Sequence, residues 1–205
     1  MSTYKKNLEL LTKNNVYSKE MEHDACGVGL IASTEGKKSR EVVEYGIEAL
    51  KAVWHRGAVD ADGKTGDGAG IHLEIPKDFF VEKIEVTGHT HDGSDICVGM
   101  IFLPRNDYSS QESCKTIVES ELTKNDFSIY GWRQVPVNPK VLGEKAFQTM
   151  PEIIQVLFKS NDKNLLDKEL ERKIYETRKK IENKAFNLSL NLSLIHISEP
   201  TRLDD

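Results

Sequence analysis

Cys26 is the residue whose type and position best suit nucleophilic chemistry. It follows the polar segment 1–25, and Gly27 and a short apolar run come directly after it. If that segment is removed as a leader, Cys26 becomes the first residue. Its own α-amino group, with a pKa of about 7.7–8.0, can then take the thiol proton directly or through a water. The alternative is an ordinary buried thiol, the commonest role of cysteine, and composition alone favours it.

Arg56 is the second candidate, in the glycine-dense loop 55–70 (HRGAVDADGKTGDGAG). Its guanidinium carries a fixed fork of donors that could orient a thiol or a free amino terminus. The alternative is a cation that satisfies carbonyls at the end of the preceding helix. The loop's aspartates are expected to form turns rather than to act as catalysts; they are Asp60, Asp62 and Asp67. No residue is assigned to substrate binding.

Other candidate sites fail on spacing. Residues 57–65 are one residue too long for a phosphate-binding loop, and a strand rather than a helix is expected after them. Residues 60–64 place Lys64 where a calcium loop needs an oxygen ligand. His89 and His91 lie in a polar turn without a third ligand, so we expect them to be solvated. No metal site and no cofactor site is predicted.

The composition excludes several classes of protein. The 205 residues suggest one domain, and 28 basic against 33 acidic residues argue against a nucleic-acid partner. No apolar run is long enough to span a membrane, and residues 1–25 lack the apolar region of a secretory signal. Three cysteines without a C-x-x-C pair fit a reducing compartment. We expect a cytoplasmic protein without a membrane partner.

The elements expected to position these residues are short strands separated by helices. The expected strands are 26–32, 71–75, 96–103, 127–137, 151–158 and 186–190, and the expected helices are 39–54, 78–84, 109–122, 140–149 and 165–183. The last helix should bury Leu166, Leu170, Ile174 and Ile181. This order could suggest a parallel sheet, but polar residues alternate along several strands, which favours half-exposed antiparallel sheets.

The last residues of the sequence resemble a foreign peptide. Residues 192–202 (LSLIHISEPTR) resemble the in-frame translation of a common sequencing adapter over their whole length. Residues 191–205 are therefore excluded from the expected fold as a non-native tail. The alternative is a native strand and a polar terminus. If the tail is foreign, the natural protein continues past residue 190, and strand 186–190 has lost its neighbours.

Three segments resemble the class II glutamine amidotransferase domain of glutamate synthases, in the same order and spacing. They are HDACGVGLIA (23–32), ALKAVWHRGAVDADGKTGDGAGIHLEIP (49–76) and VLGEKAFQTMPEIIQV (141–156). The similarity runs from about residue 22 to about residue 187. The resemblance implies that residues 26–190 are the N-terminal part of that domain. It favours Cys26 as a catalytic nucleophile over an ordinary buried thiol.

The resemblance implies an α+β fold of the N-terminal-nucleophile hydrolase type, an αββα sandwich of antiparallel sheets, incomplete here. It implies that Cys26 hydrolyses glutamine to glutamate and ammonia, with Arg56 beside it. In the full-length protein the ammonia would meet 2-oxoglutarate at a downstream synthase domain with FMN and an iron–sulfur cluster, and a small reductase subunit is a further candidate partner. Another class II amidotransferase and a non-catalytic truncated module are the alternatives.

One motif that the resemblance implies is missing. The family uses an Asn-Gly pair for its oxyanion hole, and this sequence contains no Asn-Gly dipeptide. Losing one oxyanion donor costs about a hundred- to a thousandfold in turnover. We therefore expect negligible glutaminase activity from this polypeptide alone.

Overall fold

The computed structural model describes residues 27–53, 59–66 and 68–197, together with positions 6, 10 and 13. The chain divides into two compact units, residues 1–60 with 66–71, and residues 61–65 with 72–205. The described elements in chain order are α2 (Arg40–Ala52), α3 (Lys77–Val86), β1 (Cys97–Leu103), α4 (Tyr108–Lys124), β2 (Phe127–Gln134), the short 3-10 helix η2 (Pro139–Val141), α5 (Glu144–Thr149), β3 (Glu152–Ser160), α6 (Asp167–Asn187) and β4 (Ser193–Ile197).

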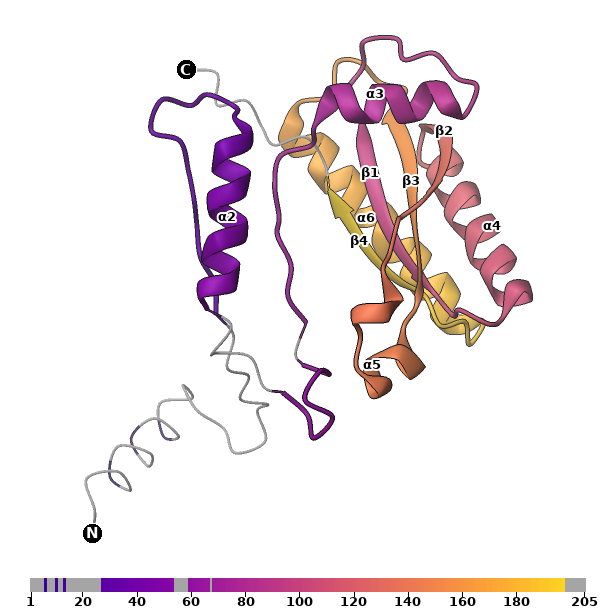
Figure 1. Cartoon of the computed structure of the whole chain (residues 1–205). Coiled ribbons are helices and arrows are strands. Elements are labelled where there is room, and N and C mark those ends of the chain that lie inside the picture. The colour runs from indigo at the N-terminus through magenta and orange to yellow at the C-terminus, as the bar shows by residue number, and fades with distance from the viewer. Residues whose placement is uncertain are drawn as a thin grey trace. The chain divides into compact units, whose positions relative to one another are not determined.

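The second unit is built on a four-stranded sheet in the order β2-β3-β1-β4 (Figure 1). Every neighbouring pair is antiparallel, and Gly99 of β1 lies opposite Val156 of β3. A bulge between Ile129 and Gly131 shifts the register of β2 against β3. The antiparallel sheet expected from the alternating strands is confirmed, and with its helices it makes an α+β fold.

Helices α4 and α6 cover one face of this sheet, and α3 packs on the other (Figure 1). Because successive strand residues point to opposite faces, Cys97 joins the core beneath α4 and α6, whereas Val98 packs with α3. The larger core also contains Cys114 from α4. Both described cysteines are thus core residues, as expected for Cys97.

The first unit lacks the strand expected at its beginning. Residues 27–32 pair with no strand within the described residues, and Val28 and Leu30 are exposed. The expected strand 71–75 is also absent, although Ile75 is buried. An apolar run forms a strand only where a partner offers backbone hydrogen bonds, and neither run has such a partner in the part of the chain that the structure describes.

The expected helix 39–54 is confirmed as α2, and its start was correctly predicted. The Ser39 hydroxyl accepts a hydrogen bond from the backbone N–H of Val42 at 3.3 Å, which caps the helix. No side chain of α2 is buried. Trp54, the expected last residue, lies outside the described residues.

Two expectations at the C-terminal end are wrong. Residues 186 and 187 end α6, and Leu190 closes the turn after it by donating its N–H to the carbonyl of Ala185, so no strand forms over 186–190. Leu166 is exposed because it precedes the first turn of α6 as its N-cap, where the helical spacing no longer places it on the buried face.

The segment excluded as a tail forms β4 in this chain, along the edge of β1. The side chain of Leu194 is 6% exposed and joins the larger core. Alternating residues suffice to form an edge strand. The pairing of β4 with β1 therefore does not show whether this segment is native or foreign. The foreign origin of residues 191–205 stays a prediction.

Candidate functional site

Both residues predicted to be catalytic, Cys26 and Arg56, lie outside the described residues, and so does Asp67. The structure describes residues 27 onward after Cys26 and residues 59–66 after Arg56. Residues 27–33 are neither helix nor strand, and an isolated antiparallel bridge joins Val59 to Gly66. The structure thus describes the loop after Arg56 rather than the arginine itself.

The loop 59–66 is organised around the carboxylate of Asp62. One oxygen, Oδ1, accepts the backbone N–H groups of Lys64 at 2.9 Å and Thr65 at 2.7 Å. The other, Oδ2, accepts the Thr65 hydroxyl at 2.6 Å. Gly63 between them has φ +68°, a conformation that glycine adopts without a steric cost. Asp62 is therefore a turn former, as the sequence predicted.

The same side chains contact the start of α5, about eighty positions along the chain. Asp62 Oδ2 accepts the backbone N–H of Glu144 at 3.0 Å, and Thr65 Oγ1 accepts that of Ala146 at 3.5 Å. Gly143 is buried against the loop, and a Cβ there would overlap Asp62 Oδ2 and Thr65 Oγ1. The second and third segments of the resemblance thus meet in space.

The hydrogen bonds within the loop stabilise the ionised form of Asp62. The Thr65 hydroxyl, followed by the backbone N–H groups of Thr65 and Lys64, holds the pKa of the Asp62 carboxyl far below its usual range. Asp62 is therefore a carboxylate at neutral pH and has no proton to give as a general acid. Its chemistry is that of an acceptor that shapes the loop.

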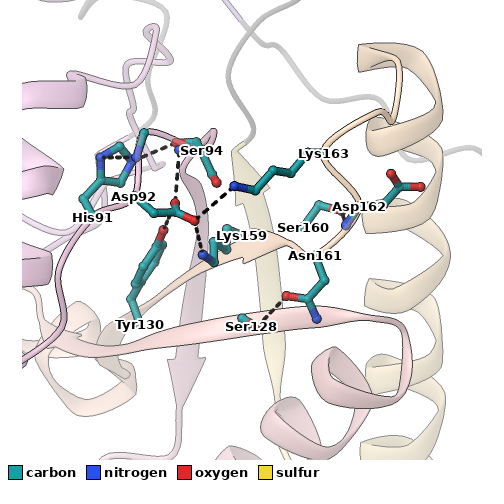
Figure 2. A network of polar contacts seen from close by, with 11 residues as sticks. His91, Asp92, Ser94, Ser128, Tyr130, Lys159, Ser160, Asn161, Asp162 and Lys163 are labelled. Carbon is teal, nitrogen blue, oxygen red and sulfur yellow. Dashed lines mark hydrogen bonds and ion pairs between the residues drawn. The ribbon is translucent and has the colours of Figure 1, made fainter.

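A second polar network, which the sequence did not indicate, surrounds Asp92 (Figure 2). Its carboxylate accepts the Lys159 ammonium at 2.6 Å and the Tyr130 hydroxyl at 3.2 Å, and Lys163 lies 3.8 Å away. Lys159 holds the pKa of Asp92 well below its usual range, and Asp92 in turn raises the pKa of Lys159. The network joins the loop after α3 to β2 and β3.

His91 belongs to the same loop and is not a freely solvated side chain, contrary to expectation. It is half-buried, its Nε2 lies 2.7 Å from the carbonyl oxygen of Ser94, and its Nδ1 accepts the N–H of Gly93 at 3.3 Å. The proton therefore resides on Nε2. Within the described residues, no group of three or more His, Cys, Asp or Glu side chains could hold a metal ion.

The comparison with protein families decides where the chain belongs. Residues 26–199 match the family described as glutamine amidotransferases class-II. The chain belongs to this family. The match covers the three segments that carried the resemblance from residue 26 onward, and it begins at Cys26.

Relatives in this family are glutamate synthases. The chain is 50% identical over 191 residues to the NADPH glutamate synthase large chain of Azospirillum brasilense, covering 93% of this chain and 12% of that protein. It is 39% identical over 174 residues to a ferredoxin-dependent glutamate synthase of Pyropia yezoensis, covering 84% and 11%. It is 41% identical over 162 residues to ferredoxin-dependent glutamate synthase 1 of Arabidopsis thaliana, covering 78% and 10%. The chain thus spans about a tenth of the length of these relatives.

In the part of the chain that the structure describes, no helix combines the length and the apolar character needed to cross a bilayer.

Proposed function

We propose that this chain is the glutaminase segment of a glutamate synthase and that Cys26 is its nucleophile. The observation that carries the proposal is the family match, which starts at Cys26 and continues to residue 199. The 50% identity to the Azospirillum brasilense protein supports the glutamate synthase branch rather than another class II amidotransferase. Residues 1–25 would be the leader whose removal frees the amino group of Cys26.

The reaction follows from the chemistry of a terminal cysteine. The freed amine takes the thiol proton, and the sulfur attacks the side-chain carbonyl carbon of glutamine. The carbon–nitrogen bond breaks as the amine returns the proton, and ammonia leaves. Water then cleaves the thioester to give glutamate and the free thiol. Arg56 would orient the thiol or the terminus through its fork of donors.

We propose a two-sheet fold for the complete domain. We assign the four-stranded sheet under α4 and α6 to one half of an αββα sandwich. The antiparallel pairing of all its neighbouring strands supports this assignment.

The remaining parts of the full-length protein would lie beyond this chain. FMN, an iron–sulfur cluster, the synthase domain that receives ammonia, and a small reductase subunit are assigned there. The described residues do not fit an iron–sulfur cluster, because Cys97 and Cys114 are buried in the apolar core and no metal-ligating cluster occurs among the described side chains. No step of the reaction above runs through these groups. The proposed location is the cytoplasm.

Two measurements test the proposal on the longer gene product. Intact mass spectrometry should find a mature chain that begins at Cys26. Glutamine hydrolysis should vanish in Cys26→Ala and persist in Cys114→Ala, a matched control that removes a buried core thiol. Full turnover in Cys26→Ala, or in a protein that keeps its leader, would contradict the assignment.

A further inference from the structure

The contact between residues 61–65 and α5 joins the second and third segments of the family resemblance, 49–76 and 141–156. Asp62 accepts the N–H of Glu144, and Thr65 accepts that of Ala146, so two side chains of the loop cap the first turn of α5. The carbonyl oxygen of Gly143 meanwhile accepts the N–H of Phe147 within that turn. We call the set Asp62, Thr65 and Gly143 the loop clamp.

Several hydrogen bonds and one close backbone approach hold the loop against α5. Asp62 alone accepts four hydrogen bonds, three from within the loop and one from α5. Gly143 leaves no space for a larger residue between the loop and the helix. A movement of the loop away from α5 would break the Asp62 and Thr65 contacts together and leave the two N–H donors to water.

Two clamp residues, Asp62 and Thr65, lie close in sequence to Arg56, the second predicted catalytic residue. Val59 and Gly66, which are joined by an antiparallel bridge, bracket Asp62 and Thr65 along the chain. Arg56 precedes Val59 by three residues, which is at most about 10 Å of extended chain. Asp62 and Thr65 thus lie a few residues along the chain from the predicted catalytic arginine, and a displacement of about 1 Å at a reacting group can cost about a hundredfold in rate.

We propose that Asp62 and Thr65 are positioning residues for glutamine hydrolysis, which act by clamping the loop after Arg56 to the start of α5. The inference rests on the proposed function, because it concerns the rate of the reaction assigned to Cys26. It assigns Asp62 and Thr65 a role through the loop rather than on the reacting atoms. If Asp62 and Thr65 served folding alone, their substitution would change the fraction of folded protein. It would not change kcat per folded active site.

The first experiment examines the clamp in the 205-residue chain itself. Hydrogen exchange is followed at the amides of Thr65, Glu144 and Ala146 in the parent, Asp62→Asn, Thr65→Val and Thr65→Ser. Exchange should be faster at all three amides in the first two variants and close to the parent in Thr65→Ser, which keeps a hydroxyl. Equal exchange in the parent and Asp62→Asn overturns the clamp.

The second experiment measures kcat and KM for glutamine in the longer gene product, with active sites counted by stoichiometric alkylation of Cys26. Asp62→Asn and Thr65→Val should lose about ten- to a hundredfold in kcat per titrated site. Thr65→Ser, which keeps the hydroxyl, should retain most of the parent's kcat per titrated site. Asp78→Asn, the same change at an exposed residue of α3, should match the parent.

The outcomes separate the two proposals. Unchanged kcat per titrated site in both clamp variants, in a parent that hydrolyses glutamine, overturns the positioning role and leaves the proposed function standing. A parent that hydrolyses no glutamine overturns the proposed function and, with it, this inference.

Discussion

Asp92 and Lys159 form an ion pair of 2.6 Å that joins the loop after α3 to β3, and the Tyr130 hydroxyl donates to the same carboxylate (Figure 2). Three segments of the second unit therefore depend on one charge. Because Lys159 is largely covered by its neighbours, with 21% of its side chain exposed, this pair is shielded from solvent more than an ordinary surface pair.

Asp92→Asn should lower the stability of the chain at neutral pH, and the deficit should shrink in acid. The pKa of Asp92 is depressed in the folded state, so the unfolded carboxyl, with a pKa of about 3.9, binds its proton first as the pH falls. The stabilisation is complete above the unfolded pKa and is lost as the pH falls through the folded pKa. Urea midpoints at several pH values between about 7 and 3 would measure the change. Asp95→Asn, in the same loop and exposed, is the control; a deficit that does not depend on pH would contradict the prediction.

The ion pair of Glu121 and Lys184 predicts which of the two side chains is more costly to remove for the stability of the chain. Glu121 on α4 is almost fully buried, with a side chain 6% exposed, whereas its partner Lys184 on α6 is 44% exposed. Removal of the lysine leaves a buried carboxylate with Lys124 alone, at 3.5 Å, whereas removal of the negative charge leaves a lysine that can turn to water.

The urea midpoints should therefore fall in the order parent, Glu121→Gln, Lys184→Met. Lys184 lowers the pKa of Glu121, so the gap between parent and Lys184→Met should narrow as the pH falls through that pKa. Lys168→Met, at the exposed start of the same helix, should behave like the parent. A Glu121→Gln midpoint below that of Lys184→Met would reverse the expected order and contradict the prediction.

The sequence predicted the elements that carry their own local signals. Helix α2 was predicted from the spacing of its apolar residues and from Ser39, and β1 from the apolar run 96–103. The runs 27–32 and 71–75 misled because a strand needs a partner, which no local pattern reveals. The contact of Asp62 with Glu144 joins residues 82 positions apart, and the sequence supplied the residue types but not the pairing. Cys26 and Arg56 remain predictions, since they lie outside the described residues.

Gly99→Ala should destabilise the chain even though alanine is better suited to a strand. A Cβ at Gly99 would lie 2.8 Å from Val156 Cγ1 on the paired strand, and valine has little freedom to move away. Overpacking of this kind costs about 1–3 kcal/mol. Gly68→Ala, where a Cβ meets nothing within 4 Å, is the matched control. Denaturant unfolding would measure the difference, and equal free energies of unfolding in the two variants would show that the strand relaxes around the methyl group.

Removal of β4 should increase the self-association of the chain. β4 covers the edge of β1 from Val98 to Phe102, and Leu194 is buried in the core beneath α4 and α6. A chain that ends at residue 191 would expose the unpaired backbone groups of β1 and would lose the burial of Leu194, worth about 1.5–3 kcal/mol. A chain that ends at residue 197 keeps β4 and is the control. Light scattering across a concentration series should show larger species for the shorter chain alone, and monomers for both chains would mean that the β1 edge does not template association. The prediction holds whether residues 192–202 are native or foreign, because the edge is covered by this strand in either case.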